Sequence, residues 1–379
     1  MPFDLHELLR LALQHQASDL HLKVGVPPVL RIDHQLLPLQ DRPRLTQADM
    51  DAVIHLVATD GQRLQLGQRR ELDLAFAVQG VGRIRANLYQ QRGTIGVAFR
   101  VIPDKVQTID ELNLPPIVAK LALEPRGLVL VTGTAGSGKS TTLAAMIDHI
   151  NNSGTGHILT IEDPIEFLHR DKRCLITQRE VGIDTESFAE ALRSALRQDP
   201  DVILVGEMRD FDTVNMAILA AETGHLVMST LHTIDAAETI NRIISIYPPY
   251  QHRQIRLQLA SVLRGIISMR LIPRADGKGR VPAVEVMVST ATIRECIADA
   301  DKTRKIIELI AAGGSEYGMQ TFDQSLMSLY RRGTVSYEEA LRWSSNPNDF
   351  TLKVRGIESA GEQPWTAEQK EKPLGRKRR

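Results

Sequence analysis

The spacing of hydrophobic and polar residues changes several times along the first hundred residues. Apolar residues between Leu5 and Leu13 recur at helical spacing, and the residues after Asp19 then alternate between apolar and polar as in a half-buried strand. The same patterns predict further short strands at residues 29–32, 72–76, 82–88 and 96–101. We therefore predict a small mixed domain of helices and strands over residues 1–102.

A different pattern begins after residue 125. Residues 103–125 contain four prolines and are predicted to form a linker with a short helix. Beyond them, short apolar strands alternate with longer helical patterns, which is typical of an α/β fold with a mostly parallel sheet. The predicted strands are 128–132, 158–161, 202–205 and 226–230, and the predicted helices are 140–150, 188–197, 213–222 and 254–269. We predict that this second domain spans residues 126–356 and that the basic tail 357–379 is disordered.

A glycine-rich segment follows the strand predicted at 128–132. It reads Gly133-Thr134-Ala135-Gly136-Ser137-Gly138-Lys139-Ser140-Thr141, satisfies the P-loop pattern, and leads into a predicted helix. Glycines allow backbone N–H groups to turn toward a phosphate, and the helix N-terminus adds a favourable dipole. Lys139 would reach the β- and γ-phosphates, and Ser140 would bind Mg²⁺. The alternative is a glycine-rich turn with a chance lysine. The context between strand and helix favours a site for ATP and Mg²⁺.

Carboxylates follow two other strands of the predicted sheet. Glu207 comes after the apolar run 202–205, and residues 162–166 (Glu-Asp-Pro-Ile-Glu) follow the strand 158–161. In a parallel sheet these positions lie at the edge where ligands bind, and an ATPase needs a carboxylate there to hold Mg²⁺ or to orient water. The sequence leaves open which carboxylate of 162–166 faces the nucleotide and which caps the following turn.

Two histidines flank the strand predicted at 226–230. His225 precedes it and His232 follows it, so the two imidazoles are expected at opposite edges of the sheet. His232 is therefore the better candidate for a contact with the γ-phosphate. Residues 82–100 also carry Arg83, Arg85 and Arg100. These arginines either solvate strand edges or complete the site of an oligomeric ATPase by neutralising transition-state charge.

The amino-acid composition disfavours or excludes several classes of protein. Lys+Arg and Asp+Glu both total 46, which gives zero formal charge, and aromatic residues make up only 4%. Neither feature favours a nucleic-acid binder that uses a broad basic face with stacking aromatics. Two cysteines without a CxxC pair exclude a disulfide framework and a four-cysteine zinc site. No apolar run has the length of a membrane span, and no signal peptide is readable, so we expect a cytoplasmic protein.

Three blocks together resemble the secretion-type traffic ATPases: residues 162–166, 206–210 and 224–233. Segments 18–22 and 318–324 narrow the resemblance to the type IV pilus retraction ATPases, over about residues 3–356. The resemblance implies a homohexameric ring with a PAS-like N-terminal α+β domain and a RecA-like P-loop ATPase core, and nucleotide between the two domains. The site residues it implies are Lys139, Glu166, Glu207, His225 and His232, with Mg²⁺ near Ser140, Glu166 and Glu207, and with Arg83, Arg85 and Arg100 from the N-terminal domain.

The resemblance also implies partners. Such a ring acts at the cytoplasmic face of the inner membrane on a pilus platform protein, through which it associates with the membrane, and pulls pilin subunits out of the fibre. Thr134-Ala135 replaces the usual Pro-Thr of the family, which should matter little because backbone groups bind the phosphates. The retraction signature Ala-Ile-Arg-Asn-Leu-Ile-Arg-Glu is changed more deeply in residues 291–299, where its second Arg is lost. This leaves an accessory paralogue, acting beside another retraction ATPase, as an alternative.

Three more distant interpretations remain. Assembly and secretion ATPases of the same superfamily generally carry a longer N-terminal region and a four-cysteine zinc insertion, which this sequence lacks. A hexameric nucleic-acid translocase is disfavoured by the charge balance, and a scaffold that no longer hydrolyses ATP is disfavoured by the complete set of Lys139, Ser140, Glu166 and Glu207. The tail 370–379 could contact anionic lipids, although a solvated end is the simpler interpretation.

Overall fold

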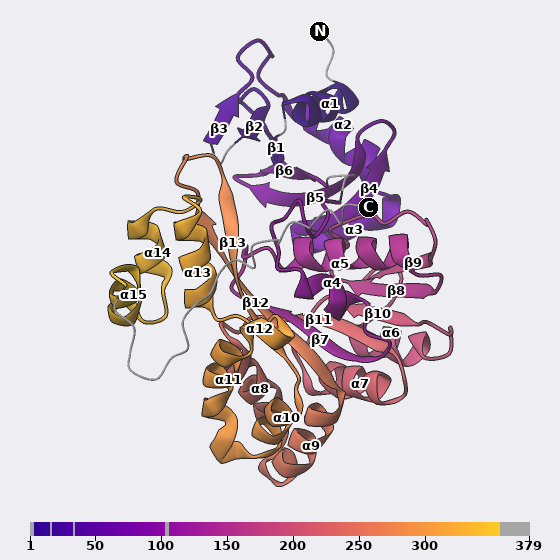
Figure 1. The fold of residues 1–379 in the computed structure, drawn as a ribbon. Helices are drawn as coiled ribbons and strands as arrows, with labels where there is room; N and C mark the ends of the chain where they lie inside the picture. Colours follow the sequence, from indigo (N-terminus) through magenta and orange to yellow (C-terminus); the bar gives the residue numbers. More distant parts are fainter. Residues whose placement is uncertain (1–3, 16, 33–34, 103–105, 357–379) are drawn as a thin grey trace, which may run out of the picture.

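The computed structural model describes residues 4–15, 17–32, 35–102 and 106–356. Part of the predicted linker and the whole predicted disordered tail lie outside these residues. Two β-sheets dominate the described chain (Figure 1). Where the chain is described, no helix combines the length and the apolar character needed to cross a membrane.

The N-terminal sheet is antiparallel and six-stranded. Its order is β3 (Gln35–Pro38), β2 (Val29–Ile32), β1 (Asp19–Lys23), β6 (Thr94–Val101), β5 (Gly82–Gln91) and β4 (Glu71–Val78). Helices α1 (Leu5–Gln14), α2 (Gln47–Val57) and α3 (Asp60–Arg69) accompany it. One apolar cluster joins the sheet to α1 and α2, as the helical spacing of the leucines predicted.

The two faces of this sheet differ. On β5, Ile84, Ala86 and Leu88 are buried in the apolar cluster. Because side chains alternate along a strand, the intervening Arg83 and Arg85 lie on the other face. Arg83 forms an ion pair with Glu180 of the second sheet, so this polar face is turned toward the rest of the molecule.

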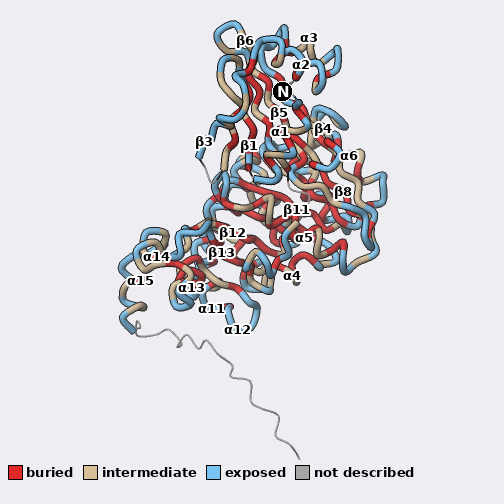
Figure 2. The backbone as a smooth tube through the Cα atoms, turned by 90° about the horizontal axis from the view of Figure 1, so that it is seen from above, coloured by how far each residue is buried: buried red, intermediate tan, exposed pale blue. Residues whose placement is uncertain are grey.

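The second sheet has seven strands. Its order is β13 (Arg280–Val288), β12 (Leu263–Pro273), β7 (Gly127–Thr132), β11 (Leu226–Leu231), β10 (Val202–Val205), β8 (His157–Glu162) and β9 (Leu175–Glu180). All neighbouring pairs are parallel except β12 with β13. The buried strands run through the middle of the molecule in Figure 2. The predicted parallel sheet and its four predicted strands are confirmed.

Helices cover both faces of this sheet. The apolar cluster on one face includes α4 (Ile117–Ala122) and α5 (Lys139–Ser153). The cluster on the other face draws on α6 (Phe188–Ala195), α7 (Phe211–Glu222), α8 (Ala236–Ser245), α9 (His252–Val262), α10 (Ala291–Ala298) and α11 (Ile306–Ala312). After α12 (Gly314–Tyr317), α13 (Phe322–Arg331), α14 (Tyr337–Trp343) and α15 (Pro347–Val354) pack against the far ends of β12 and β13. Short 3₁₀ turns lie at Pro249–Gln251 and Ala300–Lys305.

One predicted helix is partly wrong. The pattern over 254–269 predicted a single helix, but α9 ends at Val262 and the chain continues as β12. Gly265 disfavours continuation of the helix, and the β-branched pair Ile266 and Ile267 favours a strand once β7 and β13 offer hydrogen bonds on both sides. A Cβ at Gly265 would lie 2.8 Å from Leu121 of α4, so the absent side chain also lets that helix pack closely.

Candidate active site

The P-loop joins β7 to α5. Gly133 has φ of +143° and Gly138 has φ of +97°, a region that residues with a Cβ rarely adopt. A Cβ on Gly133 would also lie 2.5 Å from the carbonyl oxygen of Met269 and from Oγ of Ser137. The glycines at these two positions are therefore required by the turn, and the loop from 134 to 136 is exposed.

The N-terminus of α5 differs from those of the three helices that follow in the same domain. Side chains of Ser187, Asp210 and Asp235 cap α6, α7 and α8, whereas Gly138 provides no side-chain cap for α5. The first N–H groups of a helix need partners, and without a cap they can bind an anion. Ser137 Oγ is buried and finds no hydrogen-bond partner among the described residues. The predicted phosphate site therefore has unused donors directed at it.

Lys139 is the first residue of α5 and only 8% of it is exposed. Its Nζ donates to the carbonyl oxygens of Gly133 (2.9 Å) and Thr134 (3.0 Å) and lies 3.4 Å from Nδ1 of His232. Burial lowers the pKa of Lys139, while the carboxylates Glu207 and Glu166 act to raise it. The P-loop thus holds a cation close to two of the carboxylates that the sequence predicted.

Glu207 follows β10 and connects to the P-loop lysine through His232. Its Oε1 lies 3.2 Å from His232 Nε2, and its Oε2 lies 2.6 Å from Nη2 of Arg209. Because an ammonium can only donate, Nδ1 of His232 accepts from Lys139 and Nε2–H donates to Glu207. Burial acts to raise the pKa of Glu207, but the hydrogen bond from Arg209 and the nearby His232 outweigh it, so the pKa lies below its usual value. Glu207 is thus a carboxylate at neutral pH.

The structure separates the roles of the two glutamates in 162–166. Glu162 Oε1 accepts from Thr160 Oγ1 (2.7 Å) and Gln178 Nε2 (3.1 Å), and its Oε2 accepts from the backbone N–H of Glu166 (3.4 Å). Burial raises the pKa of Glu162. Glu162 therefore fastens the turn, whereas Glu166 is exposed and acts electrostatically on Lys139.

A buried glutamate on β9 holds the same turn from the other side. Glu180 Oε2 accepts from the backbone N–H of Ile165 at 3.2 Å and pairs with Arg83 Nη2 at 2.5 Å. Sequence reasoning missed both Glu180 and Arg209. The polar composition of β9 hid that strand from a search for apolar runs. Arg209 could have been found from its position two residues after Glu207.

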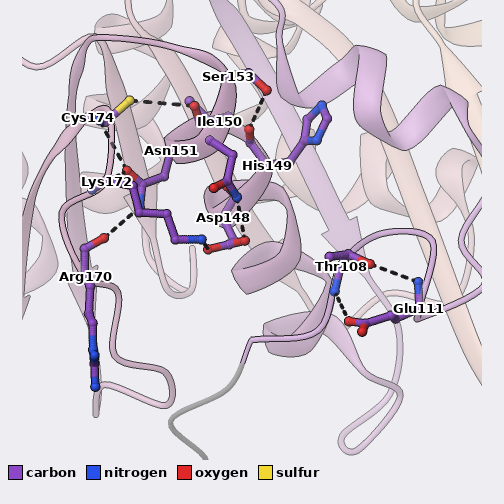
Figure 3. Close-up of polar contacts among 11 residues, drawn as sticks. Thr108, Glu111, Asp148, His149, Ile150, Asn151, Ser153, Arg170, Lys172 and Cys174 are labelled. Atoms are coloured by element: carbon purple, nitrogen blue, oxygen red, sulfur yellow. Dashed lines mark hydrogen bonds and ion pairs between the residues drawn. The ribbon is translucent and has the colours of Figure 1, made fainter.

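The far end of α5 is tied to the loop that precedes β9 (Figure 3). Asn151 is fully buried; its Oδ1 accepts from the backbone N–H groups of Lys172 and Cys174, both at 3.2 Å, and its Nδ2 donates to the carbonyl oxygen of Arg170 at 2.8 Å. Lys172 Nζ also lies 2.6 Å from Oδ1 of Asp148. These contacts fix the direction of the helix whose N-terminus forms the P-loop.

His225 does not lie with the other predicted site residues of this chain. It precedes β11, whereas His232 follows it, so the strand geometry separates the two by about 20 Å. Nδ1 of His225 lies 2.9 Å from the carbonyl oxygen of Ala220, near the C-terminus of α7. The same carbonyl also accepts from the backbone N–H of His225 at 3.2 Å and from Thr223 Oγ1 at 3.1 Å, so the imidazole is part of the network that closes the C-terminus of α7.

The three predicted arginines share the polar face of the N-terminal sheet. Arg85 and Arg100 are directly opposite each other on β5 and β6, and Arg83 lies two residues from Arg85. Arg83 pairs with Glu180, and Nε of Arg100 lies 2.9 Å from Oδ1 of Asp19. The structure therefore brings the arginines together, but among the described residues Arg83 and Arg100 form their ion pairs with Glu180 and Asp19 and not with the P-loop.

The donors near the P-loop fit Mg²⁺ in the way expected for nucleotide sites. Mg²⁺ prefers oxygen ligands and usually takes only one or two from the protein, the rest coming from phosphates and water. Ser140 supplies a hydroxyl beside the uncapped helix end, and Glu166 and Glu207 supply carboxylates near Lys139. Within the described ranges, no three His, Cys, Asp or Glu side chains converge as a metal centre.

The parallel sheet, the P-loop after β7 and the carboxylate after β10 define a P-loop ATPase with a RecA-like core. The chain belongs to the Type II/IV secretion system protein family, whose model matches residues 3–346.

Known relatives cover nearly the whole chain. It is 47% identical to the "Type IV pilus retractation ATPase PilT" of Pseudomonas aeruginosa, over 92% of this chain and 100% of that protein. It is 40% identical to the "Type IV pilus ATPase PilU" of the same organism, over 94% and 93% of the two chains. A crystal structure of the pilus retraction motor PilT with bound ADP superimposes with a TM-score of 0.85 at 45% identity, covering 91% of this chain and 98% of that one. The predicted family and fold class are confirmed.

Proposed function

We propose that this protein is a hexameric motor ATPase that couples ATP hydrolysis to the retraction of type IV pili, and so to twitching motility. One observation carries the proposal: Lys139 of the P-loop, His232 after β11 and Glu207 after β10 form a continuous chain of contacts at one edge of the sheet. The similarity to the PilT protein over its full length supports the step from ATPase to retraction motor.

In the proposed reaction, Lys139 and the N–H groups of the P-loop bind the β- and γ-phosphates and neutralise their charge. Mg²⁺, held near Ser140, Glu166 and Glu207, would supply further charge neutralisation between the phosphates. Glu207 is ionised and orients the attacking water, and His232 contacts the γ-phosphate. For His225 the contacts favour a structural role at the end of α7.

The arginines of the N-terminal sheet complete this proposal. Arg83, Arg85 and Arg100 lie on the face that is turned toward the ATPase domain, and we assign one or more of them to a nucleotide bound at a subunit boundary of a homohexamer. The ring would act at the cytoplasmic face of the inner membrane on the platform protein of the pilus. Membrane association would then come from the partner.

The signature at 291–299 supports a second candidate function. On α10, Ile293 and Ile297 are buried, whereas Arg294 is exposed and available to a partner. Ala298 stands where the retraction signature has its second Arg, so one charge of this surface is missing. An accessory motor that assists a paralogous retraction ATPase would tolerate this loss.

The test is complementation of a strain that lacks all retraction ATPases, with shortening of labelled pili measured directly. We expect retraction that is weaker than with a relative carrying the full signature, and strengthened by Ala298→Arg. Lys139→Ala is the control and should abolish retraction. The proposal would be overturned if this protein supported no retraction, whether expressed alone or together with a paralogous retraction ATPase. Full-strength retraction by this protein alone would show that the second Arg is dispensable.

A further inference from the structure

A row of buried polar side chains crosses the sheet below the P-loop. Thr132, Ser268 and Glu285 lie on the neighbouring strands β7, β12 and β13, and at most 2% of each residue is exposed. Thr132 is in register with Ser268, and Ser268 with Glu285, so all three project from the same face. Thr132 Oγ1 donates to Ser268 Oγ at 2.9 Å. The row begins at the residue that precedes Gly133.

The carboxylate at the end of this row reaches a different element. Glu285 Oε1 accepts a hydrogen bond from the backbone N–H of Ala236 at 2.9 Å. Ala236 is the first residue of α8, and its N–H belongs to the set that a helix cannot satisfy internally. The macrodipole of α8 also favours a negative charge at this point. Glu285 therefore fastens the start of α8 to β13.

The segment fastened in this way carries a site residue. Only Thr233, Ile234 and Asp235 separate His232 from Ala236. Two further bonds stiffen this short connection: Thr233 Oγ1 to Thr239 Oγ1 at 2.7 Å, and the N–H of Ile234 to Glu238 Oε2 at 2.9 Å. Both lie within the connection and α8. Among the hydrogen bonds of the described residues, the one that Ala236 donates to Glu285 ties the end of this connection to the sheet.

The surroundings of Glu285 show that this bond comes at a cost. Burial raises its pKa to about 7; Asp235 and Asp323 act in the same direction, while the Ala236 N–H and Arg270 oppose it. The guanidinium of Arg270 is itself engaged elsewhere, 3.8 Å from the centre of the Phe322 ring and hydrogen-bonded to the carbonyl oxygen of Trp343 at 2.7 Å. A buried carboxyl group in such a position is unfavourable for the fold alone.

We propose that Glu285 is a positioning residue for ATP hydrolysis, which holds His232 between Lys139 and Glu207 by fixing the N-terminus of α8. The inference deepens the proposed function and rests on the contact assigned there between His232 and the γ-phosphate. In this role the side chain must be long enough for its acceptor oxygen to bind the Ala236 N–H. The phosphate-binding groups of the P-loop lie on another element, so the effect belongs to turnover and not to ATP affinity.

Two conservative variants separate reach from charge. Glu285→Gln keeps the length of the side chain and an acceptor oxygen but removes the charge, whereas Glu285→Asp keeps the charge and withdraws the oxygen by one methylene. We expect kcat within about twofold of the parent for Gln and about tenfold lower for Asp, with KM for ATP unchanged in both. Thr303→Val is the matched control, because Thr303 is a similarly buried polar residue that lies next to α10, away from His232. This substitution should lower the midpoint of thermal unfolding and leave kcat unchanged.

A second arm tests whether the effect passes through His232. In a His232→Ala background, Glu285→Asp should lower kcat little further, because residues that act through one another are not additive. Three results would overturn the inference. The first is a normal kcat for Glu285→Asp, and the second is a loss of kcat in Glu285→Gln as large as that in Glu285→Asp. The third is full additivity of Glu285→Asp with His232→Ala. If His232→Ala alone turns over normally, the proposed role of His232 fails, and the defect of Glu285→Asp can no longer be assigned to it.

Discussion

Replacing Glu207 by Gln separates chemistry from binding at this site. The Gln side chain keeps the shape of Glu207 and can still accept one hydrogen bond, but it lacks the negative charge. In the structure that charge faces Arg209 and His232, and the pKa of Glu207 lies below its usual value, so the native group is fully ionised at neutral pH. Glu207→Gln therefore removes a charged acceptor from the position where water would be oriented.

The expected magnitude follows from what the group contacts. Phosphate affinity rests mainly on Lys139 and the loop amides, which Glu207 does not hold directly, so ATP affinity should change only modestly. Loss of one well-placed general base or water-orienting group lowers a rate by about 100-fold or more. That corresponds to about 2.7 kcal/mol in the activation free energy.

The assay measures ATP affinity and steady-state hydrolysis on the same hexameric preparation. Glu308→Gln, an exposed glutamate of α11, serves as the control for removal of one negative charge. Near-normal hydrolysis by Glu207→Gln would refute the reasoning and move the catalytic role to Glu166. An equal loss of binding and turnover would instead identify Glu207 as mainly a metal ligand.

Three further outcomes are expected. Lys139→Ala should abolish ATP binding and turnover together, because the buried ammonium is lost; substantial remaining activity would disprove the P-loop assignment. Arg83→Ala should reduce turnover more than nucleotide affinity, whereas loss of rings with normal activity in those that remain would indicate a structural role. Glu285 binds its proton more tightly in the folded state, so its contribution to the free energy of unfolding should fall by about 3 kcal/mol as pH rises from 4.5 to 7. Denaturation of Glu285→Gln beside the parent protein across this range measures it, and parallel pH profiles would contradict it.

The parts of the fold that the sequence predicts well are those fixed by local pattern. The run Val202–Val205 forms β10 at the predicted residues because four consecutive apolar side chains suit a strand covered on both faces. The edge at which the site forms also follows from sequence, since the carboxyl ends of parallel strands coincide. His232 and Glu207 were accordingly predicted at one edge, and in the structure Nε2 of His232 lies 3.2 Å from Oε1 of Glu207.

Other features depend on tertiary partners and were not predictable in this way. β12 reads as a continuation of a helix until β7 and β13 are present to pair with it. The choice between Glu162 and Glu166 depends on Gln178, which belongs to a strand that local pattern does not reveal. In both cases the decisive partner lies elsewhere in the sequence, so the spacing of nearby residues carries no information about it.

The site residues are held by hydrogen bonds from elements other than their own. Glu180 of β9 fixes the turn that carries Glu166, and Glu285 of β13 fixes the segment that follows His232. These two glutamates lie on opposite edge strands of the seven-stranded sheet, so each flank of the site depends on a strand that contributes no group to the chemistry. Because Glu180 also binds Arg83 of the N-terminal sheet, a displacement of that sheet relative to the ATPase core must either break this ion pair or pull on the turn before Glu166.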